Sequence, residues 1–201
     1  MVKDKQNIDR AVFREIHFVK SITALEQRPQ PPLPEIGFVG RSNVGKSSLL
    51  NALTNRKRIA KVSSTPGKTQ TINYFLVDHS FYFVDLPGYG FAKIAKSIHK
   101  SWQNMIEKYI LHSEQLRVLT ILMDIRRTLQ KPDAQMTDWL NYLNIPYLVV
   151  LTKSDKLNKQ KLNQQKKYYE AEFPDHHVLA VSVHNRTSIR DLALLLDSYI
   201  R

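Results

Sequence analysis

The stretch GFVGRSNVGKSSLL, residues 37–50, decides the fold of this chain. Its segment GRSNVGKS, residues 40–47, matches the pattern G-x-x-x-x-G-K-[ST]. The apolar residues before it predict a strand, and the spacing of apolar residues over 46–55 predicts a helix. A glycine-rich turn between a strand and a helix can curl its main-chain N–H groups around phosphate oxygens, because glycine has no Cβ in the way. The sequence therefore predicts a phosphate-binding loop, and the dipole of the helix N-terminus adds to the attraction.

Two side chains of this loop have the chemistry to bind a nucleoside triphosphate together with Mg²⁺. The Lys46 ammonium is expected to reach the β- and γ-phosphates, and the Ser47 hydroxyl is expected to be a ligand of Mg²⁺. The other residues supply mainly main-chain contacts. The predicted nucleotide-binding residues of the loop are Gly40, Arg41, Ser42, Asn43, Val44, Gly45, Lys46 and Ser47.

Two later strand ends indicate which nucleotide is bound. In FVDLPG, Asp85 can hold a water molecule on Mg²⁺, and Gly88 can offer an N–H to the γ-phosphate. In LTKSD, the Asp155 carboxylate can accept the N1–H and the exocyclic amino group of guanine, while the stem of Lys153 lies over the base. Adenine has no N1–H and would leave this carboxylate unpaired, which discriminates strongly against it. The predicted contacts are Asp85, Leu86, Pro87, Gly88, Thr152, Lys153, Ser154 and Asp155.

Apolar strands and helices alternate along the rest of the chain. Strands are predicted over residues 73–77, 81–85, 116–124, 146–152 and 177–183, and helices over 96–112, 132–143, 159–173 and 189–201, the last capped by Ser188. This order predicts an α/β fold with a mostly parallel sheet covered on both faces, to which the 73–85 hairpin adds one antiparallel strand. The domain is expected to span residues 36–201. Residues 1–35 are expected to form an N-terminal segment with an edge strand, HFVKSI, and a proline-rich linker, RPQPPLP.

The composition indicates where in the cell the protein is expected and what kind of partner it is expected to bind. The chain has 201 residues, a net charge of +12 and no cysteine, which excludes disulfides and thiol chemistry. No apolar run approaches the roughly 20 residues of a membrane span, and the N-terminus lacks a signal-peptide pattern, so a cytoplasmic protein without a membrane partner is expected. Residues 36–77 contain no acidic side chain. This unopposed positive charge favours a polyanionic partner over a merely cationic surface.

The segments GRSNVGKSSLLNAL, TPGKTQT, DLPGYGFAK, MDIRR and LTKSDK together resemble the EngB family of bacterial ribosome-assembly GTPases, in the translation-factor class. The resemblance covers residues 36–201. It implies a three-layer α/β/α P-loop GTPase domain that binds GTP and GDP with Mg²⁺ and hydrolyses GTP slowly. It further implies a switch needed to assemble the large ribosomal subunit, and so for bacterial growth and cell division. The implied partners are the large subunit and its rRNA, bound by a monomer without DNA specificity.

The resemblance also assigns roles to residues that carry no signal by themselves. The first switch is expected at Gly67, Lys68, Thr69, Gln70 and Thr71, with Thr69 as the second protein ligand of Mg²⁺. By spacing alone, Thr65 and Thr71 are alternatives to Thr69. The fifth GTPase element is expected at Val181, Ser182 and Val183, where Val183 replaces a smaller residue that is usual in the family. Lys46, Thr69 and Gly88 are the residues expected to act on the transferred phosphoryl group.

Two further residues, Tyr89 and Asn43, bear on how GTP would be hydrolysed. Tyr89 stands where Ras-like enzymes have the glutamine that orients water, so intrinsic turnover is expected to be slow. Tyr89 is either exposed, beside Phe91 and Lys93, or packed against the switch helix. Asn43 is either a ligand of K⁺ or simply a residue that tolerates a tight loop.

The seven histidines indicate no metal site. Two rival functions are a GTP-gated RNA-binding module with incidental hydrolysis and a small-molecule kinase.

Overall fold

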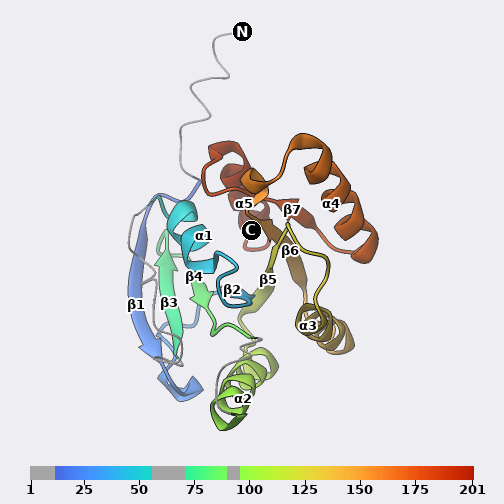
Figure 1. The fold of residues 1–201 in the computed structure, drawn as a ribbon. Coiled ribbons are helices and arrows are strands. Elements are labelled where there is room, and N and C mark those ends of the chain that lie inside the picture. Colours follow the sequence, from blue (N-terminus) through green and yellow to red (C-terminus); the bar gives the residue numbers. More distant parts are fainter. Residues whose placement is uncertain (1–11, 56–70, 90–95) are drawn as a thin grey trace.

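The computed structural model describes residues 12–55, 71–89 and 96–201, and over 96–103 it describes only the backbone. A seven-stranded sheet in the order β1-β3-β4-β2-β5-β6-β7 forms its centre (Figure 1). Neighbouring strands pair in parallel from β4 to β7, while β3 runs antiparallel to both β1 and β4. The prediction of a mostly parallel sheet with one antiparallel strand is therefore confirmed. The strands are β1 Ile16–Ile22, β2 Glu35–Gly40, β3 Ile72–Val77, β4 Phe81–Asp85, β5 Leu116–Asp124, β6 Tyr147–Thr152 and β7 Val178–Ala180.

Helices cover both faces of the sheet and complete the three layers. Buried residues of α1 and α5 belong to one core cluster, and buried residues of α2, α3 and α4 belong to the other. Within β2, Ile36 and Phe38 face the first cluster and Val39 faces the second, which explains why the strand is a continuous apolar run. Across the described residues, no helix has the length and apolar character to cross a membrane. The helices are α1 Lys46–Leu53, α2 Lys96–His112, α3 Lys131–Tyr142, α4 Lys159–Glu172 and α5 Arg186–Ser198.

The strand expected in the N-terminal segment lies at the edge of the sheet. β1 pairs antiparallel with β3, from Ile16 opposite Val77 to Ile22 opposite Ile72. Just before β1, the Phe13 ring packs edge-on against two rings of β4. β1 therefore extends the sheet of the main domain, while the division of the chain at residue 35 stays a prediction.

The closing helix begins earlier than the sequence predicts. α5 starts at Arg186, and its N-cap is Asn185, whose side chain accepts a hydrogen bond from the backbone N–H of Ser188. The prediction that Ser188 caps this helix is therefore wrong. Ser188 lies in the first turn, and its Oγ accepts from the backbone N–H of Ser182 at 3.2 Å. The preceding strand is correspondingly shorter than predicted, because residues 181–183 belong to the loop between β7 and α5.

Candidate nucleotide-binding site

The predicted site residues come together because parallel strands end at the same edge of the sheet. The loop after β2, the ends of β4 and β5, and the loops after β6 and β7 all lie at the carboxyl edge. Ligands of open α/β sheets bind outside this edge. Among the described residues, this edge contains the P-loop (residues 40–47), the D-x-x-G segment (85–88), the T-K-x-D segment (152–155) and residues 181–183.

The backbone of the P-loop has the shape that its glycines predict. Gly45 has φ +108°, a left-handed conformation that side chains disfavour, and it is the N-cap of α1. A Cβ added to Gly40 would lie 2.9 Å from the carbonyl oxygen of Leu122 on β5, so the turn can pass this close to β5 only without a side chain. Asn43 also adopts a left-handed conformation, with φ +61°. Ser47 lies in the first turn of α1, next to Lys46.

An ion pair between Lys46 and Asp85 lies on the side of the edge where the phosphates are expected. The Lys46 ammonium donates to Asp85 Oδ1 at the end of β4. Since the two side chains are only 15% and 11% exposed, each charge depends on the other for compensation. Asp85 Oδ2 accepts from Asn73 Nδ2 at 3.2 Å, and Asn73 Oδ1 accepts from the Thr71 hydroxyl at 3.2 Å. This chain of contacts connects the P-loop lysine to Thr71, the last residue of the expected first switch.

Asn73 is a site residue that sequence reasoning missed. It lies opposite Asp85 in the antiparallel pairing of β3 with β4. Its Oδ1 also accepts from the Ser21 hydroxyl of β1 at 2.7 Å. The one available signal was a polar residue in an otherwise apolar strand, and only the register of the hairpin reveals its partner.

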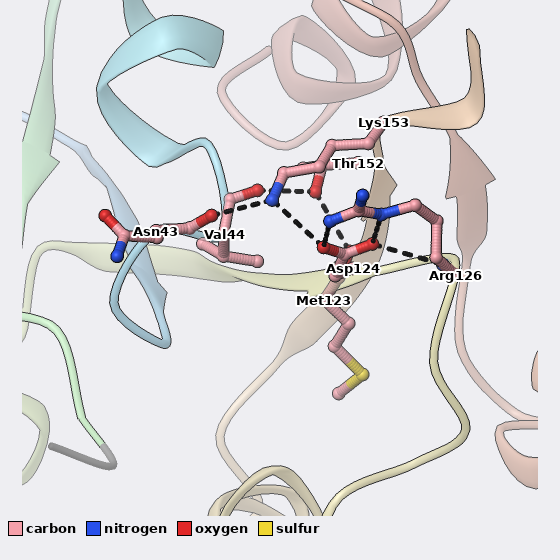
Figure 2. A network of polar contacts seen from close by, with 7 residues as sticks. All are labelled: Asn43, Val44, Met123, Asp124, Arg126, Thr152 and Lys153. Atoms are coloured by element: carbon pink, nitrogen blue, oxygen red, sulfur yellow. Dashed lines mark hydrogen bonds and ion pairs between the residues drawn. The ribbon is translucent and has the colours of Figure 1, made fainter. Parts of the chain in front are cut away.

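The opposite side of the P-loop is held by a second cluster of charges, drawn in Figure 2. Lys153 Nζ donates to the carbonyl oxygen of Asn43 at 2.7 Å and to Asp124 Oδ2 at 2.9 Å. Arg126 binds the same carboxylate through Nε at 2.9 Å and Nη2 at 2.7 Å. Burial raises the pKa of Asp124, but the hydrogen bonds from Arg126 and Lys153 outweigh it and hold the pKa well below its usual value.

Thr152 contacts the P-loop within the protein. Its hydroxyl lies 2.6 Å from the carbonyl oxygen of Val44 and 3.1 Å from that of Met123 (Figure 2). The residue is almost fully buried. With Lys153, it gives the T-K-x-D segment two hydrogen bonds to the P-loop, so the segment expected near the base also positions the loop expected to hold the phosphates.

Asp155 is the predicted guanine reader, and it lies in the short 3-10 helix η2, Ser154–Lys156. Its Oδ1 accepts from the Ser182 hydroxyl at 2.8 Å, and its Oδ2 lies 3.2 Å from Lys156 Nζ. Burial raises the pKa of Asp155, but the hydrogen bonds from Ser182 and Lys156 bring the net pKa below its usual value. The side chain is therefore an ionised acceptor at neutral pH. The backbone N–H of Ser154 donates to the carbonyl oxygen of Val181 at 3.1 Å, which joins the two loops.

The D-x-x-G segment divides between the core and the edge. Leu86 is fully buried in the core, and its backbone N–H donates to the carbonyl oxygen of Phe38 at 3.0 Å. Pro87 and Gly88 are half-buried. Tyr89 is also partly buried, and its hydroxyl donates to Asp133 Oδ1 at 2.7 Å in the first turn of α3. The alternative of an exposed Tyr89 is therefore wrong.

Part of the predicted site lies outside the described residues. The first-switch residues Gly67, Lys68, Thr69 and Gln70 fall there, as do Thr65, Phe91 and Lys93. Thr71 is described, and its hydroxyl is bound to Asn73. Val183 is 39% exposed at the edge of the site, whereas Val181 and Ser182 are buried.

The fold and this site define a P-loop GTPase. A family model described as 50S ribosome-binding GTPase matches residues 35–153, more than half of the chain. The match includes the P-loop, the D-x-x-G segment and Lys153.

Similar proteins show which family of P-loop GTPases the chain belongs to. One from Clostridium kluyveri is 50% identical over 149 residues, which cover 74% of this chain and 76% of the relative. Another, from Caldanaerobacter subterraneus, is 42% identical over 185 residues, which cover 91% of this chain and 95% of the relative. Both carry the name "Probable GTP-binding protein EngB". The chain belongs to the EngB family of GTP-binding proteins and is a GTPase.

Solved structures agree on the fold. A crystal structure of a probable GTP-binding protein engB aligns with a TM-score of 0.68 at 24% identity, covering 83% of this chain and 98% of that chain. Era in complex with MgGDPNP and nucleotides 1506–1542 of 16S ribosomal RNA aligns with a TM-score of 0.67 at 20% identity. That alignment covers 85% of this chain and 57% of Era.

Proposed function

We propose that the chain is a GTP-dependent switch that binds the large ribosomal subunit during its assembly, acting as a cytoplasmic monomer, and so supports growth and cell division. The observation that carries the nucleotide part is the ionised Asp155, held by Ser182 at the same sheet edge as the P-loop. The ribosomal part rests on the family description, which names 50S ribosome binding, and on the net charge of +12.

The two sides of the edge would take different parts of the nucleotide. The P-loop amides and Lys46 would bind the phosphates, and the Asp155 carboxylate would accept the guanine N1–H and amino group. Of residues 181–183, Val183 would direct its main-chain N–H at the guanine carbonyl, because the N–H of Val181 donates to the carbonyl oxygen of Leu151 at 2.8 Å and that of Ser182 donates to Ser188 Oγ. The Lys153 stem would cover the base while its ammonium keeps its contact with Asn43.

The oxygen atoms of this chain fit Mg²⁺, which prefers hard oxygen ligands. The Ser47 hydroxyl would bind the ion directly and the Asp85 carboxylate through water, with Asn73 orienting that carboxylate. Thr69 is the further ligand that the family pattern supplies. When bound, Mg²⁺ neutralises charge on the β- and γ-phosphate oxygens.

Intrinsic hydrolysis should be slow because the D-x-x-G segment offers no side chain to orient water. Tyr89 takes the relevant position, and its hydroxyl is engaged by Asp133. Burial, together with the Asp133 charge, raises the pKa of Tyr89 well above its usual value, so it cannot act as a base. Turnover on the order of one GTP per hour is expected without a partner, by analogy with unassisted GTPases.

The ribosomal proposal is tested by measuring GTP turnover with and without purified 50S subunits. We expect turnover to rise at least about tenfold with 50S subunits and to stay unchanged with 30S subunits. Lys46→Ala should show no rise with either. Binding to rRNA alone, weakening steeply with salt and with no gain in turnover, would instead support the GTP-gated RNA-binding module.

Asn43 supports a narrower proposal, a role in binding K⁺ beside the phosphates. Its carbonyl oxygen accepts from Lys153, while its side-chain amide points away from that cluster (Figure 2). We expect GTP turnover several-fold faster in KCl than in NaCl at equal ionic strength. Asn43→Gly keeps a residue suited to the left-handed backbone but removes the amide, so it should turn over equally in both salts. Equal rates of the unmodified protein in the two salts would reject a K⁺ site.

A further inference from the structure

We propose that Glu15, His17 and His79 form a binding site for Zn²⁺ or a similar transition-metal ion, at the sheet edge opposite the nucleotide site. The three side chains are exposed and lie where β1 begins and where a turn joins β3 to β4. Since β4 runs from Phe81 at this turn to Asp85 at the nucleotide edge, the strand length separates the two places.

The spacing of the three ligand atoms suits a small tetrahedral ion. His79 Nε2 lies 2.9 Å from Glu15 Oε2, and His17 Nε2 lies 3.7 Å from the same oxygen. One ligand atom from each residue lies within 4.8 Å of the others. Zinc ligands at about 2.0–2.1 Å in tetrahedral geometry are about 3.3 Å apart. The two measured separations fall on either side of this value, and the third pair, His17 with His79, lies within 4.8 Å, so movement of exposed side chains would complete the site.

The backbone holds these side chains on one face. Glu15 and His17 are two residues apart at the start of β1, so they point to the same side. The Asp78 carboxylate accepts the backbone N–H of Arg14 at 2.9 Å and of Glu15 at 2.7 Å, which fastens the turn to the beginning of β1. His79 is therefore presented by a turn that is itself tied to Glu15.

The turn has an unusual conformation for its residues. Asp78 and His79 have φ values of +45° and +52°, both left-handed. The backbone N–H of Ser80 donates to the carbonyl oxygen of Val77 at 2.9 Å, so Asp78 and His79 are the two central residues of a β-turn. Turns with both central residues left-handed favour Asn-Gly or Asp-Gly, because glycine has no Cβ to strain the second position. A histidine there carries a conformational cost that glycine would avoid, and in return it brings an imidazole beside Glu15.

The chemistry of the three groups selects the class of metal. Two imidazoles and one carboxylate are a ligand set of zinc sites that leave the fourth position to water. Mg²⁺ and Ca²⁺ prefer oxygen ligands only, so they should compete weakly. A bound ion would crosslink the edge strand to the β3–β4 hairpin.

The test is a calorimetric titration of the full chain with ZnCl₂ in the presence of millimolar Mg²⁺. We expect one Zn²⁺ per chain in a saturable step, weakened about tenfold or more in His79→Ala and in Glu15→Gln. His112→Ala, which alters an exposed histidine at the end of α2, is the matched control and should bind as the unmodified protein does. Identical titrations of the unmodified protein and the His17→Ala/His79→Ala double variant would overturn the proposal, as would the absence of a saturable step.

Two further measurements do not depend on calorimetry. At Zn²⁺ about 100 times its dissociation constant, the midpoint of thermal unfolding should rise by roughly 5–10 °C in the unmodified protein and not in the double variant. Co²⁺ in place of Zn²⁺ should give visible absorption bands of a low-coordinate site, again absent from the double variant. Unchanged GDP binding by the variants shows that they are folded, so a lost Zn²⁺ signal would then be local.

Discussion

The two sides of the nucleotide edge each contain a lysine–aspartate pair, but the pairs differ in how fully they are bonded. Asp124 accepts from Lys153 and from Arg126, including the Arg126 backbone N–H. Lys153 donates a second hydrogen bond, to the carbonyl oxygen of Asn43 in the P-loop. By contrast, within the described part of the chain Lys46 Nζ has Asp85 as its one acceptor.

From this difference we propose that the Lys46–Asp85 pair is the one that opens to bind a ligand. An ammonium has three donors, so Lys46 keeps capacity for phosphate oxygens, and Asp85 keeps capacity for a water on Mg²⁺. Asp124 accepts four hydrogen bonds and Lys153 donates two, so we expect this cluster to support the P-loop. Similar residue pairs at one sheet edge therefore have different tasks, set by the number of their other partners.

The largest effect is expected from Lys46→Ala on the phosphate side. Losing charge-assisted hydrogen bonds to the β- and γ-phosphates should weaken GTP by about 100-fold or more, and GDP by less. Calorimetric titration of both nucleotides measures this. Lys161→Ala, which removes an exposed lysine on α4, is the matched control. Unchanged GTP affinity in Lys46→Ala would refute the assignment of the phosphate side.

On the side where the base is expected, Asp155→Asn should change which nucleotide the protein prefers as well as weaken its affinity for GTP. An amide can donate to the xanthine carbonyl where the carboxylate accepts from the guanine amino group. GTP should weaken by about 100-fold while xanthosine triphosphate binds more tightly. A competition titration measures the affinities for GTP and for xanthosine triphosphate. Asp175→Asn changes an exposed carboxylate elsewhere and should keep the preference for GTP.

The smallest effect is expected from Asp124→Asn in the supporting cluster. Since Asp124 would not touch the nucleotide, GDP and GTP should weaken by the same factor, about tenfold or less. A loss that falls on GTP alone would contradict a purely supporting role. Titrating the two nucleotides against the variant gives the comparison.

The same variant tests the sign of the pH dependence. The pKa of Asp124 is lowered in the folded protein, so its contribution to stability is present above the ordinary value of about 3.9 and is lost as the pH falls through the folded value. The difference in unfolding free energy between the unmodified protein and Asp124→Asn should therefore be constant from about pH 8 to 5 and shrink below about pH 4. Urea unfolding at several pH values measures it, and a difference that grows in acid would show the opposite linkage.

Much of the fold could be predicted because its signals are local. The predicted bounds of β5 and α2 agree with the structure, since each is a long periodic segment ending at turn residues. The start of α5 was predicted three residues late. Asn185 and Ser188 are both good capping residues, and only the bend that carries Ser182 toward Asp155 makes Asn185 the cap.

Side-chain partners far apart in sequence could not be predicted in this way. The contact of Tyr89 with Asp133 depends on how α3 packs on the sheet. That of Asn73 with Asp85 depends on the register of a hairpin. The cluster of Glu15 and His17 with His79 joins residues more than 60 positions apart, so the histidines showed no metal spacing in the sequence.

By itself, the sequence determined the phosphate loop, the order of the strands and helices, and the carboxylate suited to guanine, because each rests on neighbouring residues or on the rule that parallel strands end at one edge. Only the tertiary structure decided which charges are saturated and which stay available, because the hydrogen-bonding partners come from separate strands and helices. Lys46 and Lys153 both follow strands that end at this edge, yet among the described residues Lys46 has a single acceptor, whereas Lys153 donates to Asn43 and to Asp124 and so holds the loop in place.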